Sequence, residues 1–433
     1  MNAELKTLGQ WLEHIERLHP KTIALGLERV GQVRERLGLE PRFPIITVGG
    51  TNGKGSTCAM LEAILHHAGY RVGCYTSPHL LRYNERVRVG RVEIDDAALV
   101  KAFRAVEGAR GGVPLTYFEY GTLAALWLFA AQSVDAALLE VGLGGRLDAV
   151  NVFDADCAVV TAIDIDHVDY LGADREAIGA EKAGIFRPGR PAVCSDPAPP
   201  ERLIRRAADI GAGLLRLGLD FGAKTQGRQW QYWGPRGQRN ALPHPALRGA
   251  CQLGNAAGAI TALECLRDRL PVTMNDIRQG LLRVELPGRF QVLSGRPPVV
   301  LDVAHNVHAA RELAANLAVM GCTGRTYAVF AMLRDKDIAG VAAALAQQIS
   351  HWFIAGLTEP RGAEAGELEH ALGAARIRAS TPCASVAEAY TQACDLATEN
   401  DRIAVFGSFH TVAGVLALLE RQRMRAAAVE PRG

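Results

Sequence analysis

The sequence predicts an α/β protein of two consecutive units, each built on a largely parallel sheet. Short apolar runs alternate with stretches of helical periodicity along almost the whole chain, as in strands joined by crossover helices. A Gly-rich loop lies between the first such run and the helix that follows it, which is where phosphate loops occur in α/β folds. The alternation is interrupted near residue 290 by a Pro- and Gly-rich segment and then begins again.

The first unit is expected to extend over residues 1–288. A helical stretch that ends at Gly69 follows the first strand, and a section of weak alternation at 216–249 indicates an irregular, hairpin-containing segment at one edge of the sheet. Two further helices are expected after this section, at 255–266 and 274–284. The expected strands of this unit are 45–48, 71–77, 136–141 and 157–163.

The second unit is expected at residues 298–433, after a linker at 289–297 that is rich in Pro and Gly. Its strand-like runs are separated by helical segments, which predicts a doubly wound sheet. The expected strands are 299–303, 327–331, 352–354, 376–377 and 403–406.

Composition excludes several classes of protein. The 433 residues contain 48 Lys and Arg against 46 Asp and Glu, so the net charge of +2 offers no broad field for nucleic acid or anionic membranes. Nine scattered cysteines without a C-x-x-C pair indicate reduced thiols rather than a disulfide framework or zinc site. The most apolar run, 123–131, is far shorter than the ~20 residues of a membrane span. We expect a cytoplasmic monomer without nucleic-acid or membrane partners.

The Gly-rich loop runs from Gly50 to Thr57 with the sequence GTNGKGST. Its glycines allow backbone N–H groups to surround phosphate oxygens, Lys54 supplies a cation, and a following hydroxyl can reach Mg²⁺. The fit to the common phosphate-loop pattern is imperfect, because Val48 replaces the first glycine and Gly55 is inserted after the lysine. We predict a site for the phosphates of ATP or GTP.

Polar residues also follow other expected strands. Glu140 ends an apolar strand, where a buried carboxylate must be paired or bound to a metal. Ser77 and His167 follow two further strands, although a turn serine and an ordinary loop histidine fit the spacing as well. Lys182, on spacing alone, is a solvated helix lysine.

The loop with its inserted glycine resembles that of the ATP-dependent amino-acid ligases, which include the Mur ligases and the folylpolyglutamate synthases. Further blocks, in matching order, resemble the folate branch and within it the bacterial bifunctional dihydrofolate synthase/folylpolyglutamate synthase family. These blocks are 21–30, 75–89, 116–122, 139–151, 181–187, 286–290, 302–306 and 406–411. The resemblance implies a Mur-ligase-like phosphate-loop ATPase domain followed by a smaller Rossmann-like domain. It also implies that L-glutamate is added to 7,8-dihydropteroate and to reduced folates through an acyl phosphate.

The same resemblance implies a role for individual residues. ATP is expected at Thr51, Asn52, Gly53, Lys54, Gly55, Ser56, Asn255, Arg289 and Asp302. Two Mg²⁺ ions are expected at Ser56, Ser77, Glu140, His167 and a carbamate on Lys182. Lys54, Lys182, Arg289 and His305 are the expected catalytic residues, and the acid substrate is expected at Ile23, Ala24, Leu25, Thr116, Tyr117, Phe118, Glu119 and Asp148.

The rings of Tyr117 and Phe118 suit stacking on a pterin, and Glu119 suits pairing with its ring nitrogens, although ordinary core packing accounts for such residues too. Ala24 departs from the acidic residue expected in the segment that contacts the pterin.

Three alternatives remain: a monofunctional folylpolyglutamate synthase, a ligase of UDP-muramyl peptides and a nucleotide-dependent switch. The muramyl ligase is expected to carry a separate uridine-binding domain, but only 44 residues precede the first strand. The switch is expected to carry an Asn/Thr-Lys-x-Asp guanine-reading motif, which this sequence lacks.

Overall fold

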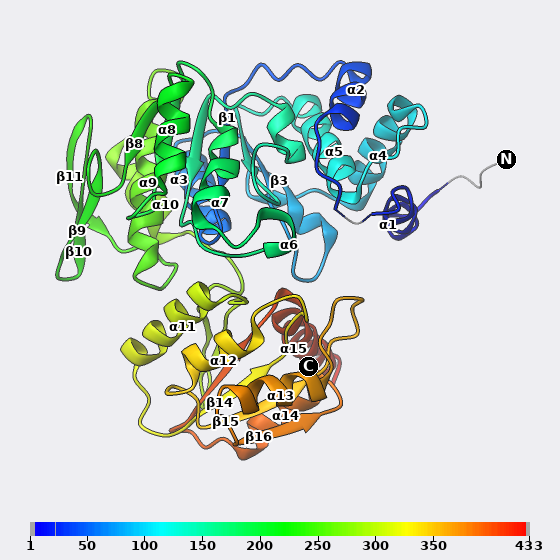
Figure 1. Ribbon diagram of the computed structural model, residues 1–433, viewed down its shortest axis with the longest axis vertical. Helices are drawn as coiled ribbons and strands as arrows, with labels where there is room; N and C mark the ends of the chain where they lie inside the picture. The colour runs from blue at the N-terminus through cyan, green and yellow to red at the C-terminus, as the bar shows by residue number, and fades with distance from the viewer. Residues whose placement is uncertain (1–4, 22, 430–433) are drawn as a thin grey trace. The chain divides into compact units, whose positions relative to one another are not determined.

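The structure, a computed structural model, describes residues 5–21 and 23–429, with side chains as far as residue 425 (Figure 1). The chain forms two compact α/β units, and the boundaries between them fall after Ala246, Cys251 and Val284. Both sheets are largely parallel, which confirms the predicted fold class.

The first unit is built on an eight-stranded sheet with the order β4-β3-β2-β5-β1-β6-β7-β8. Six strands run parallel, and β3 and β4 extend the sheet beyond β2 through antiparallel pairing, β3 with β2 and β4 with β3. Strands β1 and β5 are buried at every residue, as expected for parallel strands covered on both faces. The strands are β1 Ile45–Gly49, β2 Val72–Tyr75, β3 Val87–Val89, β4 Val92–Glu93, β5 Ala136–Glu140, β6 Cys157–Val160, β7 Pro191–Cys194 and β8 Gly213–Arg216.

Helices cover this sheet and include one that is buried along most of its length. Helix α3 begins directly after the Gly-rich loop and packs on α10, where Gly280 allows the close approach because a Cβ there would lie 2.6 Å from the Ile64 Cα. The helices are α1 Leu8–Arg17, α2 Glu28–Leu37, α3 Lys54–His67, α4 Asp96–Arg110, α5 Tyr117–Ala131, α6 Val168–Leu171, α7 Arg175–Lys182, α8 Glu201–Asp209, α9 Cys251–Cys265 and α10 Met274–Leu282. Short 3₁₀ turns lie at η1 Tyr83–Arg86, η2 Ala149–Val152 and η3 Ala183–Ile185.

The predicted hairpin-containing section forms a separate three-stranded antiparallel sheet with the order β11-β10-β9. Its strands are β9 Gly222–Gln226, β10 Gln229–Gly234 and β11 Gly237–Pro243. Tyr232 attaches this sheet to α9, because its buried hydroxyl donates to Glu264 (2.8 Å), which also accepts from Arg239 (3.0 Å).

The second unit contains a six-stranded sheet with the order β12-β13-β17-β14-β15-β16, parallel except for β12. The rings of Phe330, Trp352 and Phe406 pack together in its core, with centroid distances of 5.2–5.6 Å. The strands are β12 Gln291–Leu293, β13 Val299–Leu301, β14 Thr326–Phe330, β15 His351–Ala355, β16 Ser380–Cys383 and β17 Arg402–Phe406. The helices are α11 Val307–Met320, α12 Ile338–Leu345, α13 Ala365–Ala374, α14 Val386–Leu396 and α15 Phe409–Val429.

Two expectations differ from the structure in the second unit. The strand expected at 376–377 is wrong: Arg376 has φ +61° in the turn after α13, and the strand follows at β16. The segment expected as a linker, 289–297, contains β12, which pairs antiparallel with β13 and so belongs to the second sheet.

Within the part of the chain that the structure describes, no helix combines the length and the apolar character needed to cross a membrane.

Candidate active site

The Gly-rich loop connects β1 to α3 at the centre of the first sheet. Gly50 (φ +144°) and Gly53 (φ +93°) adopt backbone conformations that disfavour other residues. A Cβ at Gly50 would collide with Thr161, and one at Gly53 would lie 2.7 Å from Asn255 Oδ1. The loop is therefore packed between the end of β6 and helix α9, with Asn255 beside it.

Further hydrogen bonds hold the loop. The Thr51 N–H donates to the Ala162 carbonyl (2.7 Å), and its hydroxyl donates to the Asp164 carbonyl (2.9 Å). At the start of α3, Ser56 accepts a long hydrogen bond from Gln252 (3.4 Å). The buried Thr57 hydroxyl has no hydrogen-bond partner within residues 5–21 and 23–425. A preformed backbone cradle with buried hydroxyls beside it fits a nucleotide phosphate with its cation.

Two lysine side chains meet at this loop. Lys54 Nζ donates to the carbonyls of Gly50 and Thr51 (3.2 Å each), and Lys182 Nζ donates to the same Gly50 carbonyl (2.9 Å). Both lysine side chains therefore lie against the backbone of the Gly-rich loop.

Lys182 is the last residue of α7, and only 3% of it is exposed. Burial and the neighbouring charge of Lys54 lower the pKa of Lys182 to about 7, against the opposing effect of Asp166 and Asp148. The solvated helix lysine that spacing alone favoured is therefore wrong. A neutral amine at this position is the form that can react with CO₂.

Glu140 ends β5, directly beside β1 in the sheet, and is 4% exposed. Its carboxylate accepts the N–H of Ser77 (3.1 Å), which follows β2, so two of the predicted metal ligands are in contact through the backbone. His167 precedes α6 with φ +52°, and its N–H donates to the Asp166 carboxylate (2.8 Å).

Among the described residues, no group of three or more His, Cys, Asp or Glu is arranged to hold a metal. The predicted set contains only two such residues, Glu140 and His167. The serine hydroxyls and a carbamate would complete it with oxygen ligands, which Mg²⁺ prefers.

The residues expected to contact the acid substrate surround the start of α5. The Phe118 ring packs on Tyr75 (5.6 Å between centroids) and lies over Gly142, where a Cβ would be 2.8 Å from the ring. Asp148 accepts hydrogen bonds from the N–H groups of Leu143 and Val150, and its burial raises its pKa to about 7.

Glu119, expected to pair with pterin nitrogens, has partners of its own in the structure. One carboxylate oxygen accepts from Arg29 (2.8 Å) and the other from the N–H of Thr116 (2.7 Å), which caps α5. Arg29 also donates to the Ala24 carbonyl (2.7 Å), so it ties the segment 23–25 to α5. Sequence reasoning missed Arg29, although it lies within the block 21–30; Thr22 of that block is outside the described residues.

Replacing Arg29 with Met is expected to lower the free energy of unfolding, because Glu119 would keep its buried charge without its partner. Breaking a buried pair typically costs about 3–5 kcal/mol, and the partial exposure of Arg29 reduces our expectation to about 2 kcal/mol. Urea unfolding measures the change. Arg17→Met, which removes an exposed contact with Glu13, is the control and is expected to cost less than about 0.5 kcal/mol. Equal losses in the two variants would contradict the role of Arg29.

In the second unit, the predicted residues are Arg289, which precedes β12, and Asp302 and His305, which follow β13. Asp302 follows β13, accepts hydrogen bonds from the N–H groups of Phe290 and Ala304 (2.8 Å each), and has its pKa raised by burial against the nearby charge of Arg289. The Arg289 guanidinium lies 5.0 Å from the centre of the Phe409 ring, and the His305 ring is 6.2 Å from the same ring. Phe409 was not predicted as a site residue, although it lies within the block 406–411.

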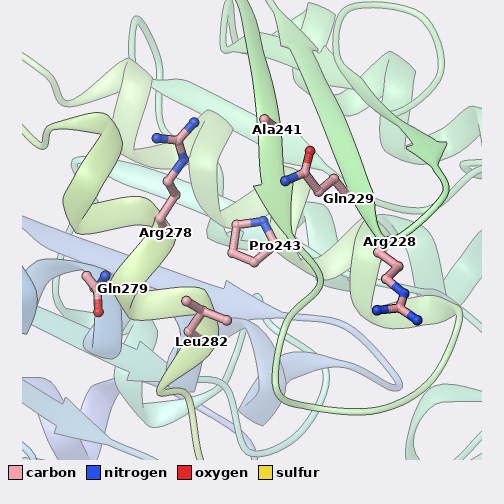
Figure 2. A pocket seen from close by; sticks show the side chains of 7 residues that line it. All are labelled: Arg228, Gln229, Ala241, Pro243, Arg278, Gln279 and Leu282. Atoms are coloured by element: carbon pink, nitrogen blue, oxygen red, sulfur yellow. The ribbon is translucent and has the colours of Figure 1, made fainter.

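A pocket of about 540 Å³ lies apart from these residues, between β11 and α10 (Figure 2). Its lining residues are Arg228, Gln229, Ala241, Pro243, Arg278, Gln279 and Leu282, none of which the sequence predicted as a site residue. We do not assign it to the active site.

Comparison with known proteins identifies both units. The Mur ligase middle domain matches residues 48–262, and the Mur ligase glutamate ligase domain matches residues 288–409. The dihydrofolate synthase/folylpolyglutamate synthase of Escherichia coli is 48% identical over 417 residues, covering 96% of both chains. The protein of the same name from Haemophilus influenzae is 40% identical, covering 97% of this chain and all of the other.

Solved structures agree with this match. The E. coli FolC protein in complex with DHPP and ADP superposes with a TM-score of 0.93 at 47% identity, covering 98% of this chain and 100% of that one. A bifunctional folylpolyglutamate synthase/dihydrofolate synthase with Mn, AMPPNP and L-glutamate bound gives 0.89 at 47% identity, covering 96% and 98%. The chain therefore belongs to the Mur ligase family, in its dihydrofolate synthase/folylpolyglutamate synthase branch.

Proposed function

We propose that this chain is an ATP-dependent ligase that adds L-glutamate to 7,8-dihydropteroate, giving dihydrofolate, and to reduced folates. The observation that carries the proposal is the convergence of Lys54 and Lys182 on the Gly50 carbonyl of a phosphate loop, beside a buried strand-end carboxylate, Glu140. The 48% identical E. coli relative and the ligands of the solved relatives support the same reaction.

The chemistry explains why the site holds cations rather than a strong nucleophile. Forming an amide in water is unfavourable, so ATP first converts the carboxylate of the acid substrate into an acyl phosphate, which the amine of glutamate then attacks. Both steps concentrate negative charge, which Lys54 is proposed to stabilise at the phosphate loop. Arg289 and His305, in the second unit, are proposed to bind the nucleotide and to assist the acyl transfer.

Two Mg²⁺ ions are the proposed metals, and when bound they would neutralise phosphate charge and polarise the transferred phosphoryl group. The residues proposed to hold them are Ser56, Ser77, Glu140, His167 and the Lys182 carbamate. The buried carboxylate of Glu140 and the buried hydroxyls beside the loop fit this cation.

The acid substrate is proposed to bind against Phe118 and Tyr117. Both oxygens of Glu119 and both oxygens of Asp148 accept hydrogen bonds within the chain, and we propose these two buried carboxylates as the candidates to pair with the ring nitrogens of the pterin. The domains proposed are residues 1–288 and 298–433, with the segment 289–297, which contributes β12 to the second sheet, between them, in a cytoplasmic monomer.

Release of phosphate from ATP is expected to require both acid substrate and glutamate, because the acyl phosphate forms on one and is consumed by the other. A coupled phosphate assay with each substrate omitted in turn measures this. Equal ATP hydrolysis without either substrate would contradict the ligase and favour a nucleotide switch. A comparison of dihydropteroate with tetrahydrofolate as the acid tests whether both activities are present.

A further inference from the structure

Arg86, the last residue of η1, lies beside Tyr117, one of the residues proposed to contact the acid substrate. Its guanidinium carbon lies 5.5 Å from the centre of the Tyr83 ring and 5.3 Å from that of Tyr117. Its Nε donates a hydrogen bond to His79 Nδ1 (2.8 Å). Two aromatic rings and a histidine therefore fix the position of this half-buried cation.

No carboxylate pairs with Arg86 among the residues that the structure describes, and neither terminal nitrogen has an acceptor there. Three other arginines of this unit have acidic partners at 2.6–2.9 Å, namely Arg29 with Glu119, Arg88 with Glu62 and Arg110 with Glu107. The planar guanidinium fork matches a carboxylate through two parallel hydrogen bonds. Arg86 thus has the geometry of a receptor for an external carboxylate.

The two neighbours of Arg86 belong to segments that we propose to hold the two ends of the acid substrate. On one side, Tyr117 is followed directly in α5 by Phe118, which we assign to the pterin ring. On the other side, His79 lies two residues after Ser77, which contacts the proposed metal ligand Glu140. An acid that contacts both Phe118 and the proposed metals would therefore bind next to the segments that hold this arginine.

We propose that Arg86 binds the non-reacting carboxylate of folates that already carry a glutamate, and so determines affinity for the chain-extension substrate. The inference rests on the proposed function. Dihydropteroate has a single carboxylate, which is the group that reacts. A reduced folate has two on its glutamate; one reacts, and the other stays anionic and needs a cation.

Steady-state phosphate release by Arg86→Gln, with either dihydropteroate or tetrahydrofolate as the acid, tests the proposal. We expect the KM for tetrahydrofolate to rise about tenfold or more, the KM for dihydropteroate to change less than about threefold, and Arg86→Lys to recover part of the loss. Arg82→Gln is the matched control, because Arg82 lies in the same segment but pairs with the partly exposed Glu93 (2.9 Å). This control is expected to leave both KM values unchanged.

Equal rises in the two KM values would overturn the proposal, because they would place Arg86 on the reacting carboxylate. Unchanged values would overturn it too. A variant that is only partly folded lowers the apparent kcat for both acids but preserves the ratio of their KM values, so the ratio stays decisive. Failure of the proposed function itself gives a different result, namely wild-type protein that releases no phosphate with either acid.

Discussion

Lys182→Ala is expected to lower kcat by about 10²–10³-fold, the loss seen when a group that stabilises charge in a transition state is removed. Lys182 is buried at the phosphate loop, 2.9 Å from the Gly50 carbonyl, and its pKa of about 7 makes the neutral amine available. Reaction of that amine with CO₂ gives a carbamate and a proton, which turns a cation into an anionic oxygen ligand for Mg²⁺. Steady-state phosphate release with both substrates present measures the loss.

Short carboxylates such as formate or acetate are expected to restore part of the activity of Lys182→Ala, because they can occupy the cavity and supply the missing oxygen ligand. Lys224→Ala, which removes an exposed lysine of β9, is the control and is expected to retain wild-type activity. Loss of activity without rescue by any carboxylate would show that Lys182 acts as a cation and would contradict the carbamate.

The same lysine predicts a pH dependence. At a fixed concentration of dissolved CO₂, the carbamate forms from the neutral amine, so its occupancy falls as the pH decreases through about 7, where Lys182 becomes mostly protonated. Carbon-13 NMR of protein equilibrated with labelled CO₂ is expected to show a carbamate signal at pH 8 that weakens at pH 6. A signal that is absent at both pH values, or present equally in Lys182→Ala, would contradict the assignment.

Much of the fold was predictable because its strongest signals are local. Parallel strands buried on both faces appear as continuous apolar runs, and a glycine loop between a strand and a helix is typical of phosphate sites. The strand expected at 376–377 is wrong for a reason equally local: a run of two residues is too short to be distinguished from a turn, and the positive φ of Arg376 leaves no signature in the sequence.

The site was harder to predict because its chemistry depends on partners distant in sequence. Burial of Lys182 beside Gly50, 132 positions earlier, overturned the solvated interpretation, which considered only the residue's own helix. The ion pair between Arg29 and Glu119 likewise joins residues 90 positions apart and gives a predicted substrate ligand a structural partner. Neither pairing can be inferred from spacing within a helix or strand.

Glu140→Gln is expected to raise the Mg²⁺ concentration for half-maximal activity more than about tenfold and to lower kcat about 10²-fold, since a neutral amide is a weak ligand for this cation. Glutamine is nearly the same size as glutamate and can still accept the hydrogen bond from the Ser77 N–H. The substitution therefore removes charge while it preserves shape. Magnesium titrations of phosphate release at saturating ATP measure both effects.

The stability of the same variant separates a metal ligand from a structural residue. A carboxylate that is 4% exposed is costly to bury, so neutralising it is expected to leave the metal-free protein as stable as the wild type or more stable. Glu93→Gln, at the end of the edge strand β4, is the control and is expected to change neither stability nor the Mg²⁺ requirement. An unchanged Mg²⁺ requirement in Glu140→Gln, or a loss of activity matched by a loss of stability, would show that Glu140 supports the sheet rather than the metal. Because Glu140 lies beside the phosphate loop, we expect Glu140→Gln to stay folded and to need a higher Mg²⁺ concentration for activity.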